Sequence, residues 1–453
     1  MSEPAAREFL GGLRRAVRNV GLYPRHHPIS DEALAGATEA ADGLSRIGGG
    51  ESALSIYEDA FYLASLVLPH SSLEFNGLLR EMQKRGIESL TLMSPVSVAD
   101  LADLAAFVAG ASGDIPAGGT IRLNERPFTP MDLESAAAMS GLRRSYARSL
   151  DVLRAISTAV RTGQDFDLTG VSWAVENLVE QTLAQPAASL LLATVKSHDE
   201  YTFYHSVNVS ILALTVGRMV GMSEEQLKLL GLGSLLHDIG KVRVATAILQ
   251  HPGRLEQDQW AEIKLHPQEG AETILAAAGP GQEVAAVVAF EHHARFDGSG
   301  YPAVDERPSP HFFSRLTTVA DTYDAITTRR AYRRAETPHR ALNVLLKGTG
   351  AQYDPDFVRA FIRMVGVYPP GSLLRLETGE VVMVTRQGHD PERPMAVLIK
   401  TAPPGEVLVD PEPIIVDPEE VVEQLLPSLV GVDPAALLEM VGVEDDSWDP
   451  HAS

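Results

Sequence analysis

The spacing of apolar residues divides this 453-residue chain into stretches of different periodicity. In residues 1–110, helical stretches precede segments in which apolar and polar residues alternate, the pattern of short strands. From residue 165 to 370, apolar residues recur at every third or fourth position, and after residue 370 the period returns to two. We therefore expect a mainly α protein, in which an all-helical bundle follows a small α/β domain and precedes a short β-rich segment.

Local signals mark individual elements of the first stretch. Apolar residues alternate on both sides of Glu58-Asp59, which predicts a β-hairpin with its turn at that pair. Ser97 followed by Asp100 predicts the start of a helix, because a serine side chain can cap the free N–H groups of a first turn. We expect residues 1–110 to form a separate domain, and a regulatory role is one interpretation of it.

Residues 111–164 are predicted to be a linker and a connecting helix. The linker is rich in Gly and Pro. The helix carries an apolar stripe close to a heptad seam, consisting of Leu142, Tyr146, Leu150, Leu153, Ile156 and Val160. Two interpretations stay open: the stripe forms a homodimer through residues 142–160, or it packs on its own domain.

Residues 371–453 are predicted to be a β-hairpin-rich extension. Apolar residues alternate on both sides of Thr378-Gly379, which predicts one hairpin, and the same alternation suggests further strands between about 397 and 409. We expect a short helix at about 418–430, followed by an acidic tail that includes residues 444–446.

Composition narrows the classes of function. The 60 acidic and 38 basic residues give a formal charge of −22, which argues against a nucleic-acid polymer as partner, because such binding depends on neutralising phosphates. The absence of Cys excludes disulfides, thiolate metal sites and Cys nucleophiles. No signal peptide is visible, and no apolar run approaches the roughly 18 residues of a membrane span, so we expect a cytoplasmic protein without a membrane span.

Histidine residues are concentrated in the helical stretch. Nine of the 14 lie between residues 198 and 339. The candidate metal ligands, each on or beside an amphipathic helix, are His205, His237, Asp238, His266, His292, His293 and Asp321. Imidazole and carboxylate donors suit two first-row cations, Fe or Mn first and Zn as an alternative. Two adjacent cations can clamp a phosphoryl group and activate water.

Four of these ligand candidates, His237, Asp238, His292 and His293, lie in two sequence motifs. His237-Asp238 is followed by Lys241, and the second motif is His292-His293-Ala294-Arg295-Phe296-Asp297-Gly298-Ser299-Gly300-Tyr301-Pro302. With the run from Ala320 to Thr327, residues 165–370 resemble the HD-GYP family of bacterial phosphodiesterases that cleave cyclic di-GMP. The resemblance implies an all-helical HD-type metal-binding bundle and hydrolysis of cyclic di-GMP to pGpG, with further cleavage to GMP as an open step.

The resemblance also implies roles for individual residues. His205, His237, Asp238 and Asp321 would form the basic metal set, and His266, His292 and His293 would complete a second site bridged by Asp238. Catalytic roles fall to Asp238 and to Lys241, which would lie near the scissile phosphate. Substrate contacts are expected from Lys241, Arg330, Arg333, Gly300, Tyr301 and Pro302. A solvated basic helix end is the alternative interpretation of Arg330 and Arg333.

Two departures from the family pattern keep other interpretations open. Ala294 stands where the family usually has Glu after the two histidines. Tyr201 stands where members with three metals have Glu, which predicts the two-metal form. The alternatives are a catalytically weak or inactive cyclic-dinucleotide sensor or interaction module, and a phosphodiesterase of another cyclic dinucleotide such as cyclic GMP-AMP.

Overall fold

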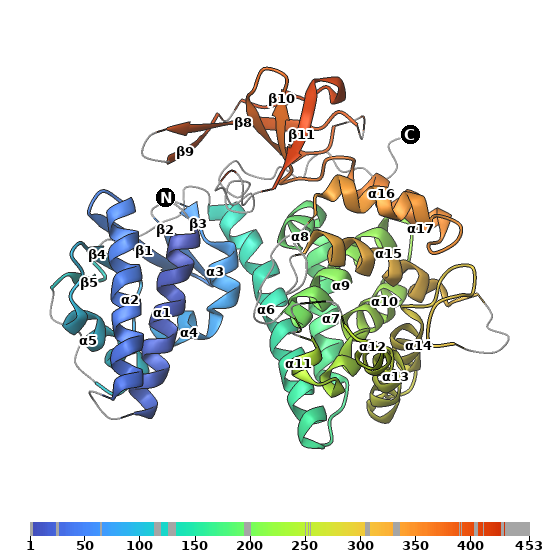
Figure 1. Cartoon of the computed structure of the whole chain (residues 1–453), viewed down its shortest axis with the longest axis horizontal. Helices are drawn as coiled ribbons and strands as arrows, with labels where there is room; N and C mark the ends of the chain where they lie inside the picture. Colours follow the sequence, from blue (N-terminus) through green and yellow to red (C-terminus); the bar gives the residue numbers. More distant parts are fainter. Residues whose placement is uncertain are drawn as a thin grey trace. The chain divides into compact units, whose positions relative to one another are not determined.

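The computed structural model divides the chain into two compact units, one made mainly of Met1–Arg143 and the other mainly of Arg144–Leu398. Each unit is described by itself, with the element labels of Figure 1. The structure describes residues 3–23, 27–63, 66–112, 119–125, 133–193, 201–249, 251, 253, 255–303, 309–328, 336–388, 390, 392–402, 406–410, 412–426 and 430.

The first unit is an antiparallel sheet with helices packed on it (Figure 1). The strand order is β3-β2-β1-β4-β5. Its elements are α1 (Glu3–Leu22), α2 (Pro28–Ile47), β1 (Glu51–Tyr57), β2 (Ala60–Leu63), β3 (Leu66–Val67), α3 (Pro69–Glu74), α4 (Asn76–Lys84), β4 (Ser89–Met93), α5 (Val98–Ala109) and β5 (Ile121–Leu123).

The alternating pattern explains why one face of this sheet is covered. Leu54 and Phe61 lie on the face that packs against α1, α2 and α5, whereas Tyr62 belongs to a separate small apolar cluster. The predicted hairpin is confirmed, since Tyr57 pairs with Ala60 across the turn at Glu58-Asp59. The predicted cap is also confirmed, because the Asp100 N–H donates to the Ser97 side chain.

The second unit contains the predicted helical bundle. Its helices are α6 (Leu133–Thr162), which begins in the first unit, α7 (Thr169–Ala184), α8 (Pro186–Leu192), α9 (Tyr201–Met219), α10 (Glu224–Leu236), the 3₁₀ helix η1 (Ile239–Arg243), α11 (Thr246–Leu249), α12 (Gln257–Ile263), α13 (His266–Ala277), α14 (Glu283–Glu291), α15 (Phe312–Thr327), α16 (Pro338–Gly348) and α17 (Pro355–Val365).

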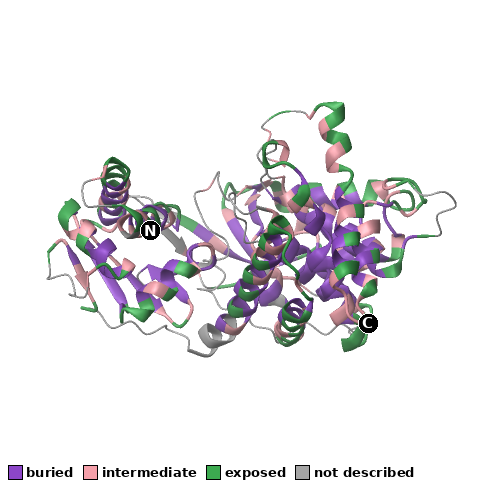
Figure 2. Ribbon diagram, turned by 90° about the horizontal axis from the view of Figure 1, so that it is seen from below, coloured by how far each residue is buried: buried purple, intermediate pink, exposed green. Residues whose placement is uncertain are grey.

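Packing among these helices builds the interior of the bundle. Helix α9 packs against α10 and α15, α10 packs against α14, and α13 packs against α14 and η1. Figure 2 shows buried residues gathered on the inward faces of the helices. The start of α10 is fixed by Ser223 and Gln226, which form a reciprocal capping box.

Five of the six residues in the apolar stripe of α6 are buried, and Val160 is half-buried. The side chains of Leu142, Tyr146, Leu150, Leu153 and Ile156 are all at most 5% exposed. The Tyr146 hydroxyl donates to Asn208 on α9, so this part of α6 packs on its own unit. This packing supports the second interpretation of the stripe, and the homodimer stays a prediction.

A β-rich segment follows the bundle, with strands β6 (Leu373–Leu376), β7 (Val381–Arg386), β8 (Met395–Ala402), β9 (Glu406–Val409), β10 (Ile414–Ile415) and β11 (Val421–Leu425). The predicted hairpin around Thr378-Gly379 is confirmed, since Leu374 pairs with Val382. The fold class predicted from the sequence is therefore confirmed: a helical bundle flanked by a small α/β unit and a β-rich segment.

The helix predicted at about 418–430 is wrong. A 3₁₀ turn, η2 (Pro418–Glu420), leads into β11, which pairs with β6 with Leu425 opposite Leu373. The pairing supplies backbone hydrogen bonds along an edge of the sheet and suits the β-branched pair Val421-Val422. Pro427 also opposes a helix running to residue 430. The acidic tail at 444–446 lies outside the described residues.

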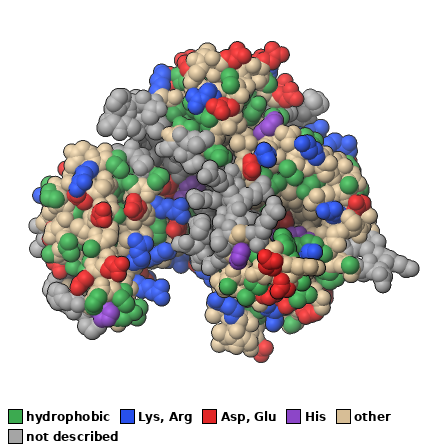
Figure 3. All heavy atoms as spheres, in the orientation of Figure 1, with side chains coloured by type: hydrophobic (Ala, Val, Ile, Leu, Met, Phe, Trp, Pro, Cys, Tyr) green, Lys and Arg blue, Asp and Glu red, His purple; other side chains and the backbone are tan. Residues whose placement is uncertain are grey.

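The charge of the surface and the hydropathy of the helices relate to the predictions on nucleic-acid and membrane partners. Figure 3 shows acidic and basic side chains interspersed over the described part of the visible face. Among the described helices, none is long and apolar enough to cross a membrane. The cytoplasmic location and the domain boundaries at residues 110, 164 and 370 stay predictions. Strand β5, which lies beyond residue 110, pairs with β4 of the first unit.

Replacing Leu150 with alanine should lower the free energy of unfolding by about 2–5 kcal/mol, because the side chain is fully buried and its loss leaves a cavity. Leu346→Ala is the control, since that leucine is 53% exposed, and its effect should stay within about 0.5 kcal/mol. Urea unfolding measures both. The dimer interpretation would be supported if the wild type is a dimer and Leu150→Ala dissociates it without lowering the free energy of unfolding.

Candidate metal centre

The candidate ligands lie at helix ends and on inward helix faces that meet inside the second unit. His237 is the C-cap of α10, His292 is the C-cap of α14, and His266 is the first residue of α13. His205 and Asp321 lie within α9 and α15. Ends and faces of packed helices thus bring residues far apart in sequence together, as helical bundles commonly do at metal sites.

Asp238 lies at the middle of the group. Its Oδ1 atom is 3.3 Å from His266 Nε2 and 3.6 Å from His292 Nε2. Its Oδ2 atom is 3.5 Å from His237 Nε2 and 3.8 Å from His205 Nε2. Two sets of donors able to hold a metal ion therefore share this carboxylate: Asp238, His266, His292 and His293, and His205, His237 and Asp238.

Backbone carbonyls fix the tautomer of three imidazoles. The Nδ1 atoms of His237, His266 and His292 lie 2.7, 2.6 and 2.8 Å from the carbonyl oxygens of the residues three positions earlier. A carbonyl oxygen can only accept, so each Nδ1 carries the proton, and each neutral ring has its lone pair on Nε2. The structure thus presents Nε2 toward the centre, and a hydrogen bond behind each ring is the usual support of a ligating histidine.

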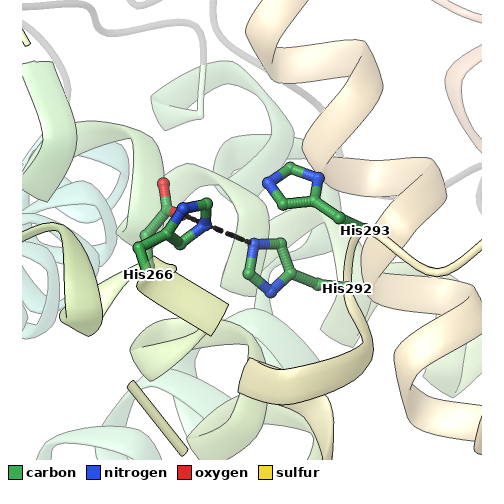
Figure 4. Close-up of side chains that lie close together, drawn as sticks. His266, His292 and His293 are labelled. Atoms are coloured by element: carbon green, nitrogen blue, oxygen red, sulfur yellow. Dashed lines mark hydrogen bonds and ion pairs between the residues drawn. The ribbon is translucent and has the colours of Figure 1, made fainter. Parts of the chain in front are cut away.

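Within the described residues, several donor atoms of the group face one another closely or lack a hydrogen-bond partner, as they would if a cation normally lay between them. Figure 4 shows His266, His292 and His293 grouped together, with the Nε2 atoms of the first two 3.1 Å apart. In the described part of the chain, His237 Nε2 and Asp238 Oδ1 are buried without a hydrogen-bond partner. Buried acceptors are normally satisfied. A divalent cation would satisfy these atoms, and the imidazole and carboxylate donors suit a transition metal.

The electrostatics favour the protonation states that metal ligands need. Burial lowers the pKa of His292 to about 4 and that of His293 well below its ordinary value, so both rings are neutral near pH 7. Burial alone would raise the pKa of Asp238, but the positive charge of Lys241 holds it well below its usual range. Neutral imidazoles and an ionised carboxylate are the forms that bind metal.

His205 differs from the other rings because carboxylates lie on both sides of it. Its Nε2 atom is 2.9 Å from Asp321 Oδ1, and its Nδ1 atom is 2.7 Å from Asp324 Oδ2. Burial lowers its pKa, but hydrogen bonds to the two carboxylates outweigh that effect and raise the pKa above its ordinary value. In the metal-free protein a proton on Nε2 therefore stands where a cation would bind.

Asp324 is a site residue that the sequence analysis missed. It is fully buried, and it accepts from His205 and from Asn208. One signal could have found it, because Asp324 follows Asp321 by three positions and residues spaced i, i+3 share a helix face.

Lys241 lies beside the carboxylate that both donor sets share. Its Nζ atom is 2.5 Å from Asp238 Oδ2, and its side chain is 17% exposed. It follows Asp238 by three residues in η1, which turns the ammonium back toward the carboxylate. The ammonium thus stands at the edge of the candidate centre.

The glycine-rich loop closes one side of the centre. The Tyr301 ring lies 4.6 Å from the His293 ring, between centroids. Gly300 has φ +95°, and a Cβ there would lie 2.4 Å from the His293 carbonyl oxygen, so a side chain is excluded. Ala294 is 3% exposed and pairs with Gly300 in an isolated bridge, and Pro302 follows Tyr301 at the half-buried end of the loop.

A second loop, which the sequence analysis did not single out, holds the first one in place. The Phe296 N–H donates to the Gln352 carbonyl at 3.1 Å, and the Asp297 N–H donates to the Ala351 carbonyl at 2.9 Å. These are backbone contacts, so no residue type advertises them in the sequence. Arg330 and Arg333 lie outside the described residues, as does the side chain of Tyr201.

Comparison with known proteins agrees with this geometry. Residues 186–357 match the family model of the HD domain. The chain is 36% identical over 230 residues to the cyclic di-GMP phosphodiesterase PA4108 of Pseudomonas aeruginosa, a match that covers 50% of this chain and 54% of the relative. It is 32% identical to the cyclic di-GMP phosphodiesterase response regulator RpfG of Xanthomonas campestris, covering 42% of this chain and 49% of that protein.

A third relative has a different nucleotide in its name. The 3'3'-cGAMP-specific phosphodiesterase 2 of Vibrio cholerae is 28% identical over 172 residues, which cover 38% of this chain and 33% of that protein. The chain thus spans about half the length of the first two relatives, and a third of this one.

Mn²⁺ binding near neutral pH should release protons, because a cation beside His205 replaces the proton that Asp321 and Asp324 stabilise there. The affinity should rise with pH until the pH passes the raised pKa of His205, and this contribution should then level off. Asp238 also faces this ring and attracts either cation. Calorimetric titration in buffers of different ionisation enthalpy measures the release. Binding without proton release and with constant affinity from about pH 6 to 8 would contradict this assignment.

Proposed function

Because residues 186–357 match the HD domain and the chain is similar to proteins named cyclic di-GMP phosphodiesterases, we propose that the chain is a metal-dependent phosphohydrolase of cyclic di-GMP. The product of the first cleavage would be pGpG. The observation that carries the proposal is the pair of donor sets sharing Asp238, with buried acceptors that lack partners in the described structure.

The residues present would hold two divalent cations, with Fe or Mn favoured by the histidine-rich donor set and Zn as an alternative. When bound, such cations neutralise phosphoryl charge and increase the acidity of water. His205, His237, Asp238 and Asp321 would hold the first cation. His266, His292, His293 and Asp238 would hold the second.

The side chains around the cations would position the substrate. Lys241 is close enough to Asp238 to lie beside a phosphoryl group bound at the centre and to stabilise negative charge on its oxygens. Gly300, Tyr301 and Pro302 would shape the substrate side of the centre, because the Tyr301 ring lies beside the His293 ring. Arg330 and Arg333 would bind the second phosphate of the dinucleotide.

Two alternatives follow from specific observations. The relative named for 3'3'-cGAMP supports another cyclic dinucleotide as substrate. Ala294, in place of the usual Glu, supports a weakly active or inactive sensor or interaction module. Purified protein loaded with Mn²⁺ or Fe²⁺ and assayed against cyclic di-GMP, cyclic GMP-AMP and cyclic di-AMP separates these alternatives. Binding of a cyclic dinucleotide without hydrolysis under every metal would favour the sensor.

Asp238→Asn should lose turnover and much of the bound metal together, because the substitution removes the charge that both donor sets share. The wild type should bind about two metals per chain, measured by elemental analysis after loading. Asp356→Asn is the matched control, since the Asp356 side chain is 81% exposed on α17, and it should change neither quantity. Wild-type metal content and activity in Asp238→Asn would disprove the dinuclear assignment.

Arg330→Ala should reduce cyclic di-GMP cleavage about tenfold or more, the effect of losing one charge-assisted contact of roughly 1.5–3 kcal/mol to the second phosphate. Hydrolysis of bis(p-nitrophenyl) phosphate, which has a single phosphate, should fall much less. Arg340→Ala is the control, because that guanidinium is exposed on α16 and pairs with Glu336. Equal losses on both substrates would place Arg330 at the metals or in folding.

A further inference from the structure

A buried chain of hydrogen bonds leads from α6 to the candidate metal centre. The Tyr146 hydroxyl donates to Asn208 Oδ1 at 2.7 Å, and Asn208 Nδ2 donates to Asp324 Oδ1 at 3.3 Å. Asp324 Oδ2 lies 2.7 Å from His205 Nδ1, and His205 Nε2 lies 2.9 Å from Asp321 Oδ1. Tyr146, Asn208 and Asp324 are fully buried, so water does not compete with these contacts.

The Tyr146 hydroxyl, which begins this series of hydrogen bonds, favours one orientation of the Asn208 side-chain amide. A phenol that donates to Asn208 Oδ1 leaves the amide NH₂ group facing Asp324, which as a carboxylate can only accept. A flipped amide would place its oxygen against the carboxylate. Burial, together with Tyr204 and Asp324, raises the pKa of Tyr146 well above its ordinary value, so the phenol keeps its proton.

The Asp324 carboxylate, at the other end of these hydrogen bonds, fixes a proton on Nδ1 of the His205 imidazole. Asp324 accepts from His205 Nδ1, which directs Nε2 toward Asp321 and Asp238. Carboxylates that orient ligating histidines in this way commonly contribute 10- to 100-fold to metal affinity. Asn208 and Thr328 both donate to Asp324, and Tyr146 in turn donates to Asn208.

We propose that Tyr146 is a positioning residue of the metal centre, which orients His205 through Asn208 and Asp324. The proposal rests on the proposed function, because it takes His205 to be a metal ligand. Tyr146 lies outside residues 186–357, the segment that matches the HD domain. The centre is therefore completed by a hydroxyl from the connecting helix, and the matched segment alone lacks one of its supports.

Tyr146→Phe tests this role, because phenylalanine keeps the buried ring and removes only the donor. We expect Mn²⁺ affinity to fall about two- to tenfold, less than the loss from Asp324→Asn, since the hydroxyl acts through two intermediates. In metal-free protein labelled with ¹⁵N-histidine, the His205 ring resonances should shift. Far-UV circular dichroism should stay unchanged. Tyr368→Phe makes the same change at a half-buried tyrosine outside this series of hydrogen bonds. It should alter neither the affinity nor these resonances.

The two readouts separate this proposal from the proposed function. Unchanged Mn²⁺ affinity together with unchanged His205 resonances in Tyr146→Phe would overturn the positioning role. If wild-type protein binds no metal, the proposed function fails. The His205 resonances of the metal-free variant then decide only whether Tyr146 orients His205: a shift confined to Tyr146→Phe supports that orientation, and no shift overturns it.

Discussion

The burial of the Asp238 carboxylate among imidazoles is the electrostatic constraint on which the second unit depends. An ionised carboxylate removed from water costs several kcal/mol unless other groups compensate it. Lys241 supplies one positive charge at its edge, the protonated His205 is shared by Asp321 and Asp324, and His292 and His293 are neutral. The metal-free centre is therefore short of positive charge. Any cation that binds it stabilises the fold as well as the site.

The helical ends that carry the ligands could be predicted because their signals are local. The capping box at Ser223 and the apolar spacing before His292 are visible within a few residues, and the structure has a helix start and a helix end there. The candidate histidines are spread over residues 205–293, and they could be grouped because their order resembles that of the HD-GYP family. The β-hairpins at Glu58-Asp59 and Thr378-Gly379 were equally predictable, since alternation and turn residues are adjacent in the chain.

The features that escaped prediction depend on distant partners. Tyr146 and Asn208 are 62 residues apart, and their contact has no local pattern. The loop at Gln352 acts through backbone atoms, which every residue type possesses. Residues 421–425 include Glu423, Gln424 and Leu425, which also suit a helix, and pairing with the edge of β6 adds to the β-branched pair Val421-Val422 in favouring a strand. In each case tertiary structure supplied information that periodicity lacks.

Helix α6 has a mechanical property that follows from its 30 residues. Such a helix is about 45 Å long, and each residue advances it by 1.5 Å. The division between the two units falls within this rod, between Arg143 and Arg144. A 2.7 Å hydrogen bond from Tyr146 cannot survive an axial displacement of that size without adjustment of Asn208. An axial shift of α6 at Tyr146 would therefore change the orientation of His205, a candidate metal ligand, without any substitution among the candidate ligands.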